Sequence, residues 1–181
     1  VPCIYAPRYY AAENGIARKL AELSLMCPRI SGSDVGEFIA GLETTSGNIF
    51  ADLQRSAIAA ALEHGVMILT GGPGTGKTTV TKALLKIFES LGMKCALAAP
   101  TGRAANRMSE ATSHEAQTLH RLLETSFSPD EEGESRFVRD DKNLLDEDVF
   151  ILDEMSMIDT LLMDSFLKAV KPGARVILIG D

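Results

Sequence analysis

The chain has 181 residues and a net charge of −7, and its hydrophobic fraction of 45% is normal for a soluble globular domain. No apolar run approaches the roughly 18 residues that a membrane span needs, so no membrane partner is expected. The start lacks the basic stretch that opens a signal peptide, and three scattered cysteines match no metal-binding spacing.

The first part of the chain predicts helices joined by a broken segment. Apolar residues recur at helical spacing over 9–26, and Pro28 ends that helix. Glycine and proline interrupt residues 28–48, which predicts a linker with a short helical piece at 35–42. Another helix is predicted at 51–64. We interpret residues 1–48 as a helical segment and linker, and residues 49–181 as the main domain.

From residue 66 onward, apolar strands alternate with helices. The predicted strands are 66–70, 94–99, 149–153 and 175–179, and the predicted helices are 76–91, 101–109, 114–125 and 159–170. Uninterrupted apolar strands separated by helices indicate a parallel sheet that is covered on both faces. The predicted fold class is therefore α/β.

Charge is unevenly distributed along this domain. Residues 130–148 hold nine acids and three bases, whereas residues 76–108 hold six bases and one acid. A basic surface for nucleic acid can therefore exist in an acidic chain. A solvated helix face explains Lys82 and Lys86 equally well. We expect residues 126–147 to form a mobile, exposed insertion with a hairpin near 136–139.

A phosphate-binding pattern connects the first strand to the following helix. The segment Gly71–Thr78 reads GGPGTGKT, in which glycines let backbone N–H groups turn toward phosphate oxygens. Lys77 would bind the β- and γ-phosphates, and the Thr78 hydroxyl would ligate Mg²⁺. The alternative is a glycine-rich turn without a ligand. We expect ATP to contact Gly72, Pro73, Gly74, Thr75, Gly76, Lys77, Thr78 and Thr79.

Two adjacent acids, Asp153 and Glu154, lie at the end of the apolar strand that begins at residue 149. Charges at the tip of a buried strand are costly unless they have partners. Asp153 is placed to hold Mg²⁺ through a water, and Glu154 to polarise the water that attacks the γ-phosphate. A solvated strand end is the alternative, and the phosphate loop upstream favours the catalytic interpretation.

Three further features have weaker signals. The segment 99–105 offers small residues together with Pro100, Thr101 and Arg103, which suit a nucleic-acid backbone. Thr118 and His120 occupy a similar segment. A capping threonine and a packed histidine explain these segments as well. Gln54, on the helix before the first strand, carries an amide that can read both edges of adenine.

Taken in order, these segments resemble the RecD branch of superfamily 1 helicases, most closely the stand-alone RecD-like form, over residues 50–181. Residues 9–17 are similar to the region just before the motor in that form. The six matching segments are an adenine-reading segment at 53–58, motif I at 71–79, motif Ia at 98–105, a Thr-x-His-x-Leu-Leu segment at 118–123, motif II at 153–157 and the start of motif III at 177–181.

The resemblance implies a RecA-like domain 1A that uses ATP to translocate 5′-to-3′ on single-stranded DNA during repair or recombination in a bacterial-type cytoplasm. It implies that Gln54 contacts adenine. It also implies DNA contacts at Pro100, Thr101, Arg103, Thr118 and His120.

The start without Met and the end after a buried strand lead us to expect a fragment that is truncated at motif III. Its partner would be a second RecA-like domain of the same parent chain, which supplies an arginine finger. Alone, the fragment would bind ATP with little turnover.

Three alternatives stay open at this point. A P-loop ATPase that remodels proteins would show no DNA dependence. A nucleotide-sensing module would bind ATP without turnover, although the intact Lys77, Thr78, Asp153 and Glu154 argue against this. A relaxase-associated conjugative helicase has a similar motif set.

Overall fold

The computed structural model describes residues 6–30, 32–47, 49–126 and 136–180. Its main sheet has five strands in the order β1-β7-β6-β2-β3, and all neighbouring pairs are parallel. Parallel strands place all their carboxyl ends at one edge of the sheet, where ligands bind in open α/β folds. The strands are β1 (Val66–Thr70), β2 (Cys95–Ala99), β3 (Ala116–Thr118), β6 (Val149–Leu152) and β7 (Arg175–Gly180).

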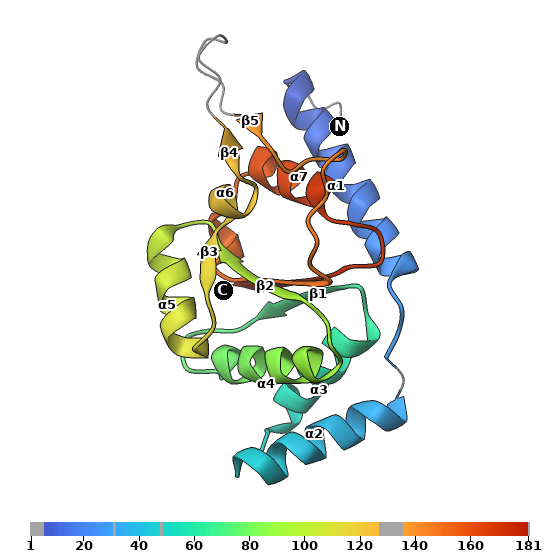
Figure 1. Ribbon diagram of the computed structural model, residues 1–181, viewed down its shortest axis with the longest axis vertical. Helices are drawn as coiled ribbons and strands as arrows, with labels where there is room; N and C mark the ends of the chain where they lie inside the picture. Colours follow the sequence, from blue (N-terminus) through green and yellow to red (C-terminus); the bar gives the residue numbers. More distant parts are fainter. Residues whose placement is uncertain (1–5, 31, 48, 127–135, 181) are drawn as a thin grey trace, which may run out of the picture.

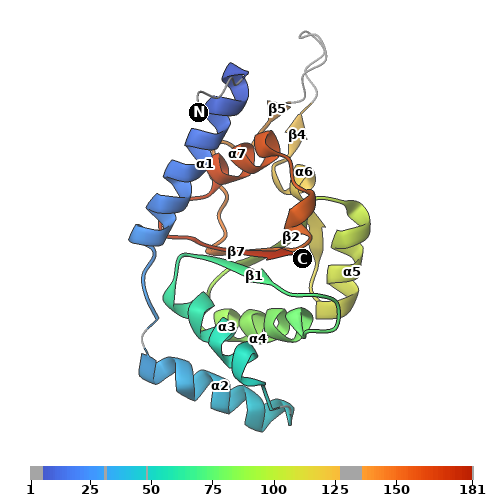
Figure 2. The same ribbon diagram turned by 180° about the vertical axis from the view of Figure 1, so that it is seen from behind.

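Helices cover both faces of the sheet because its strand residues alternate between two hydrophobic cores. Leu97, Ile151 and Ile177 face one core, which contains helices α2 (Gly32–Ser46), α3 (Asp52–Glu63) and α4 (Lys77–Ser90). Phe150 and Val176 face the other, which contains α1 (Pro7–Met26), α6 (Leu119–Leu122) and α7 (Thr160–Ala169). The resulting three layers are visible from both sides (Figures 1 and 2), and they form the RecA-like α/β domain that the sequence predicted.

The first helix packs closely on this domain. In Figure 1, α1 runs beside α7, and Gly15 on α1 lies directly against the Asp164 carboxylate on α7. Gly65, just before β1, lies against the Leu23 carbonyl oxygen and Cys27 near the end of α1. A side chain at Gly65 would collide with helical backbone, whereas one at Gly15 would have to displace the Asp164 carboxylate. The boundary at residue 48 stays a prediction.

Most predicted elements agree with the structure to within a few residues, but two differ. Helix α2 extends over Gly32–Ser46 rather than 35–42, and its buried residues Val35 and Ile39 hold it against the core. The helix predicted at 114–125 is wrong: Ala116–Thr118 forms β3, and only Leu119–Leu122 is helical. Residues 116–118 form a strand because they pair with the neighbouring β2, where Ala116 lies opposite Leu97.

A small antiparallel hairpin joins β4 (Thr125–Ser126) to β5 (Arg136–Phe137), close to the predicted position. Residues 127–135 of the expected insertion lie outside the described residues. Residues 138–147 are anchored to the domain. The Val138 N–H donates to the Glu124 carbonyl at 2.9 Å, and the buried Leu145 donates its N–H to the Ala169 carbonyl at 2.8 Å.

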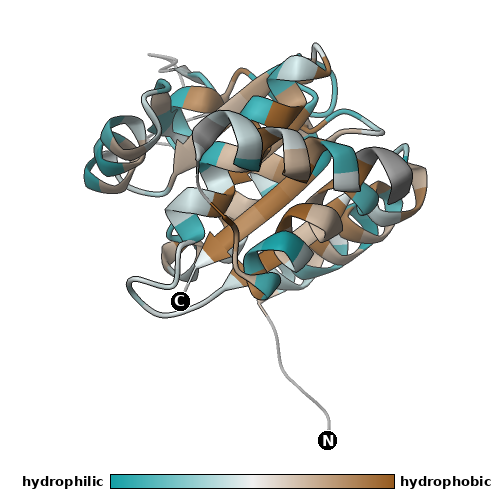
Figure 3. Ribbon diagram, turned by 90° about the horizontal axis from the view of Figure 1, so that it is seen from below, coloured by the Kyte–Doolittle hydropathy of each residue, from teal (hydrophilic) through white to brown (hydrophobic). Residues whose placement is uncertain are grey.

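Hydropathy follows this layered arrangement. Figure 3 shows apolar strands enclosed by helices whose outer residues are hydrophilic. Across the described ranges, none of the helices combines the length and apolarity required to cross a bilayer.

Candidate functional site

The phosphate loop occupies residues 71–76, between the end of β1 and the start of α4. Gly74 and Gly76 adopt φ values of +79° and +90°, a left-handed conformation that costs other residues roughly 1–2 kcal/mol. The Thr75 hydroxyl donates to the Gly72 carbonyl at 2.9 Å and closes the turn. The loop therefore has the backbone path that its glycines predict.

Lys77 opens α4, and its ammonium folds back over the loop. Its Nζ donates to the carbonyl of Gly71 and, at 3.3 Å, to that of Gly72. Thr78 is exposed in the same first turn. The N–H groups and positive dipole of a 14-residue helix point toward this position. Anionic phosphate oxygens are thus favoured here.

The two acids after β6 are held by backbone contacts. The Asp153 N–H donates to the Ala98 carbonyl at 3.0 Å, which fixes the end of the strand. The Glu154 N–H donates to Asp153 Oδ1 at 2.9 Å. Glu154 itself has φ +56° and ψ +38°, a strained conformation for a residue with a side chain. Such strain is concentrated at functional sites, where the surroundings enforce it.

A cavity of about 210 Å³ brings these predicted residues together. Lys77 and Thr78 line it from α4, and Asp153 and Glu154 line it from the end of β6. A further part of the wall comes from α5 (Gly102–Thr112), which the sequence did not assign to the nucleotide site. The α5 residues that line the cavity are Ala104, Arg107, Met108, Ala111 and Thr112.

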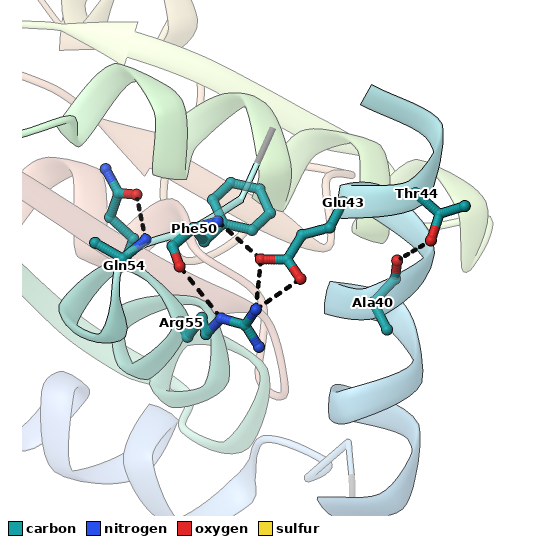
Figure 4. A network of polar contacts seen from close by, with 7 residues as sticks. Ala40, Glu43, Thr44, Phe50, Gln54 and Arg55 are labelled. Carbon is teal, nitrogen blue, oxygen red and sulfur yellow. Dashed lines mark hydrogen bonds and ion pairs between the residues drawn. The ribbon is translucent and has the colours of Figure 1, made fainter. Parts of the chain in front are cut away.

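Gln54 lies on α3 and is not among the residues that line this cavity. Its Oε1 accepts the Ala51 N–H at 3.0 Å, and its amide nitrogen lies directly against Gly76 of the phosphate loop. The start of α3 is tied to α2 by Arg55, whose guanidinium binds both carboxylate oxygens of Glu43 at 2.8 and 2.7 Å (Figure 4). The amide of Gln54 therefore has a defined position beside the loop.

The residues expected to face DNA follow two neighbouring strands. Pro100, Thr101 and Arg103 come after β2, and Thr118 and His120 come at the end of β3. Ala99 pairs with Thr118, so both segments lie at the same edge of the sheet. In the strand order, β7 and β6 separate them from β1 and its phosphate loop.

Both threonines of these segments act as helix caps. The Thr101 hydroxyl accepts the Ala104 N–H at 3.3 Å, and the Thr118 hydroxyl accepts the Arg121 N–H at 3.2 Å. Arg103 and His120 are exposed, and the His120 ring lies 5.8 Å from that of Phe137 on the hairpin. A cap leaves the second lone pair of each hydroxyl for another donor.

A family model described as an AAA domain matches residues 54–181, which include the whole nucleotide site. The chain belongs to this AAA domain family. Within the family it is RecD-like, as its relatives show. The "ATP-dependent RecD2 DNA helicase" of Deinococcus radiodurans is 39% identical over 178 residues, which cover 98% of this chain and 24% of that protein.

Two further similarities agree with this assignment. The "RecBCD enzyme subunit RecD" of Mycolicibacterium smegmatis is 36% identical over 202 residues, covering 98% of this chain and 34% of that protein. The crystal structure of Bacteroides Pif1 bound to single-stranded DNA superposes with a TM-score of 0.50 and 28% identity, over 74% of this chain and 32% of that one. This RecD-like domain thus spans about a quarter to a third of the length of these curated relatives.

Proposed function

We propose that this RecD-like domain is the ATP-binding motor of a DNA helicase that moves 5′-to-3′ along single-stranded DNA in repair or recombination. The convergence of Lys77, Thr78, Asp153 and Glu154 on one cavity carries the proposal, because phosphoryl transfer requires these groups at one place. The names of the relatives, an ATP-dependent DNA helicase and a RecBCD subunit, support DNA rather than protein remodelling as the task.

Each group of the site has a proposed role toward the nucleotide. Lys77 binds the β- and γ-phosphates over the loop at 72–79, and Gln54 contacts adenine beside Gly76. The Thr78 hydroxyl and, through a water, Asp153 would hold a Mg²⁺ ion, which would neutralise charge on the phosphates. Glu154 accepts a proton from the attacking water.

Single-stranded DNA is the proposed partner at the carboxyl ends of β2 and β3, which β7 and β6 separate from the phosphate loop after β1. Its backbone would lie along Pro100, Thr101 and Arg103 after β2, and along Thr118 and His120 after β3. A second RecA-like domain of the same protein would grip the strand from the opposite side and supply an arginine finger. Turnover by the present domain alone would therefore be slow.

Calorimetric titration of the full-length protein with Mg·ADP tests the nucleotide site. Lys77→Ala should abolish measurable binding while circular dichroism shows an intact fold. Lys86→Ala is the matched control, since it removes an exposed cation from the same helix away from the cavity and should leave affinity unchanged. Unchanged ADP affinity in Lys77→Ala would refute the assignment.

A further inference from the structure

Helix α5 connects the two halves of the proposed site. It begins immediately after Thr101, carries Arg103 in its first turn, and packs against β2, β3 and α4. Figure 1 shows it beside β3 at one side of the molecule. Further along the same helix, residues at helical spacing turn toward the nucleotide cavity. The residues of this face are Ala104, Arg107, Met108 and Ala111.

Arg107 is the only basic residue that α5 contributes to the described lining of the cavity. Its neighbour Met108 is 4% exposed and anchors the helix in the core, so the backbone that carries Arg107 is fixed. The Arg107 side chain is exposed, and within the described ranges no hydrogen bond or ion pair engages its guanidinium. The guanidinium is therefore available to an anionic ligand in the cavity.

With the proposed function, the terminal phosphates of the nucleotide would lie in this cavity. Lys77 serves the β- and γ-phosphates, and Glu154 must face the water that attacks the γ-phosphate. Gln54, which marks the adenine end, does not line this cavity. A cation that lines the same cavity as Lys77 is consequently near the one phosphate that ATP has and ADP lacks.

We propose that Arg107 binds the γ-phosphate of ATP and thereby links the state of the nucleotide to α5, the helix that starts at the DNA-facing segment. This inference rests on the proposed function. A guanidinium offers a planar pair of N–H donors that matches phosphate oxygens. Loss of the γ-phosphate removes this contact one helical turn from Arg103. The DNA segment therefore senses whether ATP or ADP is bound.

The test compares Mg·ADP with the Mg complex of a non-hydrolysable ATP analogue, both titrated into the full-length protein. Arg107→Ala should weaken binding of the analogue roughly 10- to 100-fold, as expected for one hydrogen bond to a charged group, and ADP binding by less than about twofold. Arg107→Lys should recover part of the loss. Lys86→Ala serves as the control for removal of one positive charge outside the cavity.

A second readout concerns coupling to DNA. Any difference in single-stranded DNA affinity between the analogue-bound and ADP-bound wild type should shrink in Arg107→Ala. Equal losses for both nucleotides, or no loss for the analogue, would overturn the role of Arg107 while leaving the nucleotide site intact. Failure of the wild type to bind either nucleotide would refute the proposed function instead. If the Arg107→Ala protein does not fold, the binding of the two nucleotides is compared in Arg107→Gln instead.

Discussion

Replacing Gly65 with alanine should force the end of α1 away from the start of β1. A methyl group at this buried position would overlap the Leu23 carbonyl oxygen and lie 2.5 Å from Cys27 Cβ. The Leu23 oxygen belongs to helical backbone, so no rotamer change can relieve the overlap. Either the last turn of α1 or the residue before β1 has to move.

The expected cost follows from these contacts. Overpacking a core costs typically about 1–3 kcal/mol, and a collision with backbone belongs at the upper end of that range. At about 3 kcal/mol, and with a shift of roughly 2–4 °C per kcal/mol for a chain of this length, the midpoint of thermal unfolding should fall by roughly 6–12 °C.

Gly36→Ala is the matched control. Gly36 lies within α2 with nothing within 4 Å of an added Cβ, so alanine there should raise the free energy of unfolding by roughly 0.5–1 kcal/mol. Melting followed by circular dichroism measures both variants. A Gly65→Ala midpoint within about 2 °C of the wild type would show that α1 does not pack against β1 as described.

Three other predictions concern single groups. Hydrogen bonds from Lys171 and from the Lys94 N–H lower the pKa of Asp148. The Asp148 carboxylate therefore stabilises the fold fully above its unfolded-state pKa of about 3.9. This stabilisation is lost as the pH falls through the pKa of the folded state. Because the ion pair is about a third exposed, Asp148→Asn should cost only about 0.5–1 kcal/mol at pH 7, and less as pH falls through the folded pKa, in urea titrations. A cost that does not change with pH would contradict this. Burial, with Glu89 and Asp148 nearby, raises the pKa of Cys95 to about 12. Iodoacetamide should therefore alkylate Cys95 at pH 8 more than about 100-fold slower in the folded than in the denatured protein, and similar rates in mass spectrometry would refute it. In the full-length protein, Glu154→Gln should bind ATP but hydrolyse it at least about 10²-fold slower, and near-normal turnover would place the base elsewhere.

The central strands and the phosphate loop were predictable because their signals are local. Residues 149–152 and 176–179 are apolar without interruption, and the loop pattern lies between a strand and a helix, as the structure confirms. Strand β3 was not predictable, since Ala116, Gln117 and Thr118 have no strand pattern of their own. Only the neighbouring β2 gives them partners at the edge of the sheet.

Contacts between distant segments account for the remaining differences. The glycines and the proline of residues 28–48 suggested only a short helical piece. A glycine inside an exposed helix costs only about 1 kcal/mol, however, and packing of Val35 and Ile39 offsets this cost. Arg107 was counted only as one of the six bases in residues 76–108. Its place in the nucleotide cavity depends on how α5 packs against α4, which no short pattern encodes.

ATP hydrolysis by the full-length protein, measured with and without single-stranded DNA, shows whether this ATPase domain drives movement along DNA. A motor that steps along DNA should hydrolyse ATP several-fold faster when the strand is present, and Lys77→Ala should abolish both rates. A Lys77-dependent rate that ignores single-stranded DNA would contradict the helicase assignment and favour an ATPase that remodels proteins.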